Sequence, residues 1–266
     1  IWVEWEGPRQ FAPFGQDANG PWWGFQAWRA ELDALLLERA RTLGVEVLQP
    51  CRALRPLRGE HGEVVGVETD AGPVHARVLI DAAGGAHWLA RQLDIPRVEA
   101  SPKLVATYGY VVEPEGAPGD EPQIIADDEG WTWTARVRPG VRQWTRLTLD
   151  GRPVPAGWVP PGLSERAPVG RVKGADVTWR RVAAPAGPGY LMVGDAAAVL
   201  DPASSHGVLK AFMSGMMAGH AVVRASSGAL PWPVALAGYS DWVRRWFEHD
   251  AAQLRERYRR FPRFGG

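Results

Sequence analysis

The chain has 266 residues, of which 45% are hydrophobic, and its 30 Lys+Arg residues balance 30 Asp+Glu residues. The zero net charge and the lack of an apolar run of about 18 residues give no reason to expect a nucleic acid, an anionic membrane surface or a membrane span. The single cysteine, Cys51, excludes an internal disulfide and is typical of a reducing compartment, so we expect a cytoplasmic protein.

The first third of the chain alternates between an irregular aromatic stretch and short periodic segments. Residues 1–24 are rich in aromatic residues, Gly and Pro and show no clean period. Leucines at helical spacing predict a helix over 29–43, and Gly44 ends it at the position favoured after a helix C-terminus. Apolar segments that follow predict three strands, at 45–48, 64–69 and 74–80.

The middle of the chain indicates an antiparallel sheet. Its short apolar and alternating segments predict strands at 105–112, 123–126, 131–137 and 142–149. Turn signals rich in Gly, Pro and Asp separate these segments. Residues 153–168 are proline-rich and are expected to be irregular, and 169–183 are expected to add one more strand.

The last third of the chain carries the clearest pattern. Tyr190–Val193 predicts a buried strand, and Gly194-Asp195 places a carboxylate at its carboxyl end, where ligands bind in open α/β sheets. A turn-rich loop over 201–207 leads to a small-residue helix, expected to be buried, over 208–223. The free backbone N–H groups that begin this helix form a site for an anion or a carbonyl oxygen. A final helix is predicted over 239–260.

Two motifs in this last third are similar to those of a known family. Gly194-Asp-Ala-Ala, followed by Asp201-Pro-x-Ser-Ser-x-Gly207-Val, resembles the second flavin-contacting segment of FAD-dependent monooxygenases built like p-hydroxybenzoate hydroxylase. The branch with flavin-dependent halogenases, geranylgeranyl-reductase-like proteins and hydroxylases of peptide tryptophans is most similar. The resemblance implies an α/β (α+β) fold, with a partial, Rossmann-like FAD-binding domain that lacks its first βαβ unit and an antiparallel substrate domain.

The resemblance implies that two domains alternate along the chain. Residues 1–24 and 99–184 would form the substrate domain, and 25–98 and 185–266 the FAD-binding domain. No G-x-G-x-x-G occurs in the sequence, although in the family this fingerprint opens the first βαβ unit and holds the pyrophosphate. We therefore expect a truncated chain that lacks roughly 80 upstream residues, the usual length of such a unit plus its connections, and that binds FAD poorly on its own.

The resemblance also implies which residues contact FAD. Asp195 would hold a ribityl hydroxyl, and N–H groups around Gly207 and Val208 would face the pyrimidine edge of the ring system. Arg29 would contact the phosphate–ribityl region, which a planar guanidinium suits. The further implied contacts are Val47, Ala83, Gly84, Gly194 and Pro202.

Few residues are candidates for catalysis or substrate binding. His206, in the flavin loop, either donates a proton to the flavin or serves as a hydrogen-bonding loop residue. Trp131 and Trp133 share one face of a strand, and they either line a substrate pocket or pack on the core. Lys210 lies one helical turn beyond the loop and is expected to be a solvated or snorkelling lysine. No cluster has metal-ligand spacing, so no metal site is expected.

These patterns lead us to expect an FAD-dependent monooxygenase that hydroxylates an aromatic or electron-rich substrate through a C4a-hydroperoxyflavin. Hydroxylation ranks above halogenation because Ala135-Arg136 replaces the Ile-Pro of halogenases, and Ser204 replaces the glutamate of tryptophan-type halogenases. NAD(P)H or a separate flavin reductase would reduce the flavin, and the substrate would be a small molecule or a peptide- or carrier-bound aromatic. The alternatives are a flavin-dependent halogenase, a geranylgeranyl-reductase-like oxidoreductase and, outside enzymes, a Trp-rich binding module.

Overall fold

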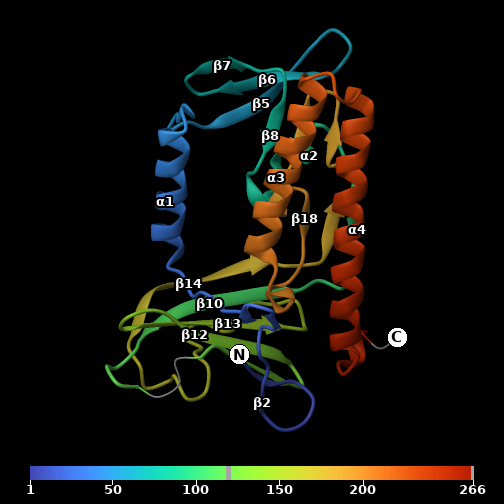
Figure 1. Cartoon of the computed structure of the whole chain (residues 1–266). Helices are drawn as coiled ribbons and strands as arrows, with labels where there is room; N and C mark the ends of the chain where they lie inside the picture. Colours follow the sequence, from blue (N-terminus) through green and yellow to red (C-terminus); the bar gives the residue numbers. More distant parts are fainter. Residues whose placement is uncertain (118–120, 265–266) are drawn as a thin grey trace. The chain divides into compact units, whose positions relative to one another are not determined.

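The computed structural model describes residues 1–117 and 121–264 of the chain (Figure 1). The chain divides into two compact units, each made of two segments. Unit 1 consists of Ile1–Val47 and Lys103–Asp176, and unit 2 consists of Leu48–Pro102 and Val177–Gly266.

Unit 1 is built on a seven-stranded sheet in the order β14-β10-β13-β12-β11-β1-β2. Neighbouring strands are antiparallel except β1 and β11, which are parallel. The strands of unit 1, including a separate small hairpin of β3 and β4, are β1 (Trp2–Glu4), β2 (Gln10–Phe11), β3 (Gln16–Asp17), β4 (Gly20–Pro21), β10 (Val105–Val112), β11 (Gln123–Asp127), β12 (Gly130–Arg138), β13 (Val141–Thr148) and β14 (Pro168–Asp176). The antiparallel sheet predicted for the middle of the chain is thus confirmed.

One cluster in the core of unit 1 forms around Val111, Trp144 and Leu163. Trp158 packs edge-on against Trp144, with ring centroids 5.4 Å apart. Gly109 lies opposite Trp144 in the register of β10 and β13, and a Cβ at Gly109 would come within 2.7 Å of the indole ring. The glycine therefore leaves the space that the buried indole occupies.

The helix predicted over 29–43 is confirmed as α1 (Arg29–Thr42). The strand predicted at 45–48 is wrong, because this segment is irregular. Val45 and Leu48 are 54% and 53% exposed, and within the described residues no strand pairs with this segment. An apolar run becomes a strand only where a neighbouring strand accepts its backbone hydrogen bonds.

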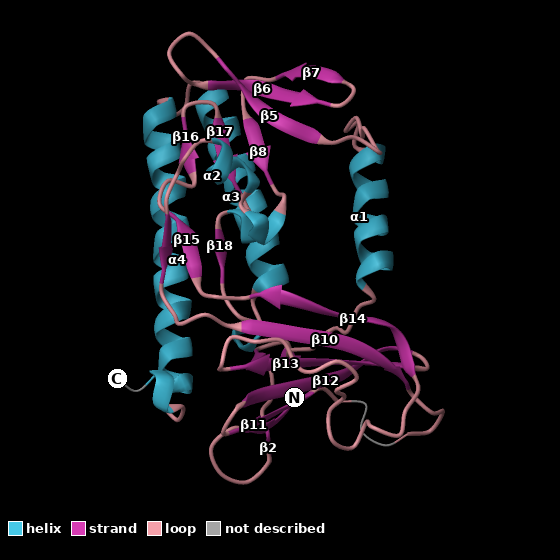
Figure 2. Ribbon diagram, turned by 180° about the vertical axis from the view of Figure 1, so that it is seen from behind, coloured by secondary structure: helices cyan, strands magenta, loops and turns pink. Residues whose placement is uncertain are grey.

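Unit 2 contains three small sheets (Figure 2). They are β5 (Ala53–Arg58), β6 (Val64–Thr69) and β7 (Gly72–His75); β16 (Ala186–Gly187), β17 (Tyr190–Met192) and β8 (Leu79–Asp81); and β18 (Ala198–Val199), β15 (Arg180–Val182) and β9 (Arg97–Glu99). The single strand predicted at 74–80 is wrong, since its start pairs antiparallel with β6 and its end pairs in parallel with β17. Two different sheets therefore share this apolar run.

The helices of unit 2 are α2 (Trp88–Gln92), α3 (Gly207–Ser226) and α4 (Trp232–Tyr258), with 3-10 turns η1 (Gly84–Ala86), η2 (Gly194–Ala196), η3 (Pro202–Ser204) and η4 (Pro262–Phe264). α3 and α4 run side by side (Figure 1). α4 begins at Trp232 instead of the predicted Tyr239, because the prolines around Trp232 fall in the first turn, where no N–H is needed. The hydroxyl of Tyr239 donates to the carbonyl of Met192 at 2.6 Å and so fixes α4 against β17.

The helix predicted over 208–223 is confirmed as α3, but the expectation that it is buried holds for one face only. Only one face of α3 is buried, and it consists of Lys210, Ser214, Ala218, Ala221 and Ala225. Larger apolar side chains on its other faces, such as Leu209, Phe212 and Met216, are exposed. The small residues face α4 and η2 because close helix packing leaves no room for large ones. No helix in the described residues is long and apolar enough to cross a membrane.

Candidate functional site

The candidate site starts at the carboxyl end of β17, where the chain turns into η2. Gly194 has φ +57°, and its N–H donates to the Ser214 hydroxyl of α3 at 2.8 Å. A Cβ at Gly194 would lie 3.3 Å from the Cβ of Ala211. The left-handed backbone and the close approach to α3 both favour glycine here. The next residue, Asp195, therefore lies beside the first turns of α3, with its side chain 53% exposed.

The loop between η2 and α3 is held by a buried carboxylate. Asp201 is fully buried and accepts hydrogen bonds from the N–H of Ala203 at 2.8 Å and the indole of Trp179 at 2.5 Å. Burial raises the pKa of Asp201 to about 6, although hydrogen bonds from Trp179, Ala203 and Tyr258 oppose this effect. Pro202, one of the predicted cofactor residues, follows Asp201 in η3 and lies in this fixed loop.

The N-terminus of α3 presents unpaired backbone donors. Its first backward hydrogen bond runs from the N–H of Lys210 to the carbonyl of His206 at 2.7 Å. The N–H groups of Gly207 and Val208 precede this bond and so have no partner inside the helix. A Cβ at Gly207 would meet no heavy atom within 4 Å. The helix therefore begins with free donors and open space, as an anion or carbonyl site requires.

An ion pair places the Asp195 carboxylate at this helix N-terminus. The Lys210 Nζ, on the first turn of α3, lies 3.9 Å from Asp195 Oδ1. The side chain of Lys210 is only 10% exposed, so the expectation that it is solvated is wrong. Burial lowers the pKa of Lys210, while the charges of Asp195 and Asp250 raise it. The structure thus places Gly194 and Asp195 beside α3, the helix that begins at Gly207 and Val208, with the buried ammonium of Lys210 as the partner of Asp195.

Ala83 and Gly84 leave the neighbouring strand at the same end of the sheet. β8 and β17 are parallel, with Asp81 opposite Met192, so the turns that follow these two strands lie at the same edge of the sheet. The carboxylate of buried Asp81 accepts from the N–H groups of Ala83 and Leu89 at 2.8 and 2.9 Å. Gly84 has φ +78°, and a Cβ there would meet nothing within 4 Å. The turn after β8 is therefore fixed by Asp81 and leaves open space at Gly84.

His87, a buried histidine that the sequence did not indicate as functional, connects the turn after β8 to the η2 turn after β17. Arg180 Nε donates to His87 Nε2 at 2.9 Å, so His87 Nδ1 carries the hydrogen and donates to the carbonyl of Ala196 at 2.9 Å. Burial lowers the pKa of His87, and the hydrogen bond to Ala196 opposes this effect. His87 has φ +49°, which is uncommon for a residue other than glycine, but isolated histidines show no pattern in the sequence that marks this role.

The remaining predicted residues lie elsewhere or have partners of their own. His206 Nδ1 lies 3.3 Å from Asp250 Oδ2, which is the geometry of a hydrogen-bonding loop residue. In unit 1, Arg29 makes a two-pronged exposed pair with Asp33 at 3.1 Å. Val47 lies in the irregular segment after α1. Trp131 and Trp133 both lie in β12, where Trp131 is 1% exposed and Trp133 is partly buried.

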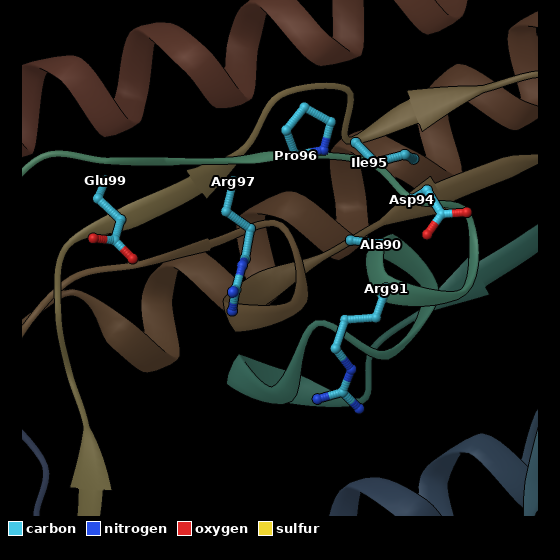
Figure 3. A pocket seen from close by; sticks show the side chains of 7 residues that line it. All are labelled: Ala90, Arg91, Asp94, Ile95, Pro96, Arg97 and Glu99. Atoms are coloured by element: carbon cyan, nitrogen blue, oxygen red, sulfur yellow. The ribbon is translucent and has the colours of Figure 1, made fainter.

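A separate hollow of about 610 Å³ opens on unit 2 between α2 and β9 (Figure 3). Figure 3 shows the side chains of Arg91 and Arg97 extending in the same direction, with Glu99 beside Arg97 and Asp94 near Arg91. None of the residues that line it belongs to the predicted cofactor set. Within the described part of the chain, no group of three His, Cys, Asp or Glu side chains could hold a metal ion.

Comparison with solved structures defines the class of fold. The myxobacterial chondrochloren halogenase CndH matches with a TM-score of 0.84 and 20% identity, over 97% of this chain and 66% of that one. The flavin-dependent halogenase CmlS matches with a TM-score of 0.74 and 20% identity, over 87% of this chain and 46% of that one. The chain therefore has the FAD-binding fold of flavin-dependent halogenases, which confirms the mixed α/β class predicted from the sequence.

The family follows from the sequence comparison. The model of the tryptophan halogenase family matches residues 9–141, half of the chain. The chain belongs to the tryptophan halogenase family, a family of FAD-dependent enzymes, and the resemblance seen in the sequence is confirmed. Protein FixC of Salmonella typhi is 32% identical over 115 residues, 43% of this chain and 27% of that protein. The chain spans two thirds or less of the length of the solved structures and the FixC relative that it matches.

Proposed function

We propose that this chain forms the FAD-contacting and substrate-facing part of a flavin-dependent oxidoreductase that acts on an aromatic substrate. The observation that supports the proposal is the 3.9 Å pair between Asp195 and Lys210, which joins a half-exposed carboxylate to the first turn of α3. The donor set fits FAD. A carboxylate accepts a ribityl hydroxyl, helix N–H groups face a carbonyl edge, and glycines without side chains admit a flat ring.

In this proposal each residue of the site has a defined task. Asp195 accepts a hydrogen bond from a ribityl hydroxyl and fixes the register of the cofactor. The N–H groups of Gly207 and Val208 donate to the pyrimidine edge. Gly84 and Ala83 approach the dinucleotide with backbone only. When bound, FAD supplies the redox chemistry with oxygen, and the protein supplies position and exclusion of water.

Four residues of unit 1 also have proposed roles, but none of the contacts described for them points to FAD or a substrate. Arg29 would contact the phosphate–ribityl region, which requires it to leave its exposed pair with Asp33, and Val47 would approach the adenine. Such an exposed pair contributes about 0.2–1 kcal/mol, so the exchange costs little. Trp131 and Trp133 would form part of a substrate wall.

The family membership supports halogenation of the aromatic substrate more directly than the hydroxylation expected from the sequence. Hydroxylation stays a second candidate because Ser204 and Ala135-Arg136 depart from the motifs of tryptophan-type halogenases. A small molecule or a peptide- or carrier-bound aromatic is the proposed substrate, and NAD(P)H or a separate flavin reductase is the proposed reductant. Reduction of an isoprenoid double bond is the third outcome. A cytoplasmic location is part of the proposal, supported by the single cysteine.

The experiment uses the complete protein encoded by the gene, supplied with FAD, a reductant and oxygen. A carbon–halogen bond that forms in an aromatic product only when bromide or chloride is present supports halogenation. Addition of oxygen that does not depend on halide supports hydroxylation. Failure to bind FAD contradicts the proposal and favours a Trp-rich binding module. The upstream fingerprint stays a prediction, and the gene sequence before Ile1 tests it.

A further inference from the structure

Lys210 is the buried cation at the candidate site that no motif explains. Its residue is 8% exposed, and its ammonium reaches Asp195 at 3.9 Å, which is longer than a hydrogen bond. A buried ammonium is costly, and a pair at this distance recovers only part of that cost. The helix would be more stable with an apolar residue here, as at Ala218 and Ala221 farther along the same buried face. The cost indicates a task other than stability.

The surroundings of Lys210 limit what this task can be. The same side chain lines a small cavity with Gly194, Ser214, Trp242 and Trp246. Aromatic rings and small residues thus line the cavity with it, and the Asp195 carboxylate, which does not line this cavity, is its ion-pair partner. Asp250 lies near enough for its charge to act on Lys210, but it is buried and already pairs with His206 at 3.3 Å. Asp195, whose side chain is 53% exposed, is therefore the partner that can still face a ligand.

We propose that Lys210 is a positioning residue that holds the Asp195 carboxylate at the N-terminus of α3, so that Asp195 accepts the ribityl hydroxyl in one fixed orientation. The inference rests on the proposed function and deepens it. It assigns recognition of the ribityl chain of FAD to the pair of Lys210 and Asp195. Lys210 acts through Asp195 and needs no contact of its own with the cofactor.

The test is a double-mutant cycle on the dissociation constant for FAD in the complete protein. Lys210→Met should weaken FAD binding about 10-fold, which is less than the full loss of the charge-assisted hydrogen bond from Asp195, because the carboxylate stays but loses its fixed orientation. In the Asp195→Asn background the same substitution should change the constant less than about threefold, because its partner is gone. Lys210→Arg should restore part of the affinity. Arg224→Met, at the exposed end of α3, is the matched control and should have no effect.

A second measurement separates positioning from folding. Lys210→Met should leave the melting temperature of the apoprotein unchanged or raised, because removal of a buried charge offsets the lost pair. If the Met variant does not fold, Lys210→Gln replaces it in the same cycle. Equal weakening in both backgrounds, or none in either, overturns the inference while the proposed function stands. If the wild-type protein itself does not bind FAD, the proposed function fails first and the inference fails with it.

Discussion

The indole of Trp179 donates a hydrogen bond of 2.5 Å to the carboxylate of Asp201, and both side chains are fully buried. Tyr258, near the end of α4, lies edge-on to the same indole, with ring centroids 5.4 Å apart. The loop that leads into α3 is therefore anchored by one carboxylate to Trp179, which precedes β15, and to the end of α4.

Asp201 should make the stability of the protein depend on pH. Burial raises its pKa to about 6 from 3.8, so the ionised form is less stable in the folded protein than in the unfolded chain. The free energy of unfolding should then fall by about 3 kcal/mol as pH rises from below 4 to 7, since each pKa unit is worth about 1.4 kcal/mol. Urea unfolding of the wild type and Asp201→Asn, compared across this range, measures the effect.

The comparison uses the pH slope, not absolute stability, because Asn also changes the hydrogen bonds to Trp179 and Ala203. Asp201→Asn should lack the part of the pH-dependence that falls between pH 4 and 6. Asp94→Asn, at an exposed residue with φ +55°, is the control and should keep it. Identical slopes in the wild type and Asp201→Asn would contradict the assignment.

Glu113 should act with the opposite sign. Burial raises its pKa, but hydrogen bonds and charge from Arg142 and Arg166 outweigh this effect and hold the pKa below its usual range. Its contribution to stability is therefore present above the ordinary pKa and lost as pH falls through the lowered one. Glu113→Gln should cost about 3–5 kcal/mol at neutral pH, because the guanidinium of Arg142 would stay buried without its carboxylate.

Chemical denaturation at pH 7 measures the cost at Glu113. The matched control is Glu129→Gln, since the side chain of Glu129 is 91% exposed and lies 3.9 Å from Arg146. That substitution should change the free energy of unfolding by less than about 1 kcal/mol. Similar losses for the two variants would show that the buried cluster does not contribute as argued.

Gly109 should be required for the core of unit 1. In Gly109→Ala the new methyl group would come within 2.7 Å of the Trp144 ring, which is itself packed against Trp158. The shift of that indole should cost about 1–3 kcal/mol, as for other overpacked cores. Gly174→Ala is the control in the same sheet, because its Cβ would meet the nearest atom, the carbonyl oxygen of Ala106, at 3.9 Å. Equal midpoints of urea unfolding for the two variants would contradict the prediction.

His87 should hold the turn that carries Asp195. His87→Leu removes the donor to Ala196 and the acceptor for Arg180, and it should cost about 2–3 kcal/mol of folding free energy. His87→Asn should cost less, since its side-chain amide can replace Nδ1 and Asn tolerates a positive φ. Thermal unfolding checks the order of the three proteins. A Leu variant as stable as the wild type would show that the bonds to Ala196 and Arg180 contribute nothing.

Much of the fold could be predicted because local pattern and final environment agree. The strands predicted at 64–69 and 105–112 are β6 and β10 to the residue. The prediction at 45–48 failed because a strand depends on a partner that sequence period does not reveal. The run at 74–80 was divided between two sheets, and an uninterrupted apolar pattern contains no signal for that division.

The spacing of Gly194-Asp195 and Gly207 predicted a strand end followed by a helix start, and the structure has both; that these residues bind FAD stays a prediction. The supporting residues of the candidate site were not predictable. Lys210 was expected to be solvated or snorkelling, since a lysine in a helix is usually exposed. Asp201 and His87 act through bonds to residues far away in the sequence, such as Trp179 and Ala196, and only the folded chain brings these together.

The most direct test of the central claim is the dissociation constant for FAD of the complete protein and its Asp195→Ala variant, measured by quenching of flavin fluorescence. Loss of the carboxylate should weaken binding about 10- to 100-fold, while Asp94→Ala leaves it unchanged. Equal affinity of the wild type and Asp195→Ala would contradict the account, because the carboxylate beside the N-terminus of α3 would then have no part in holding the cofactor.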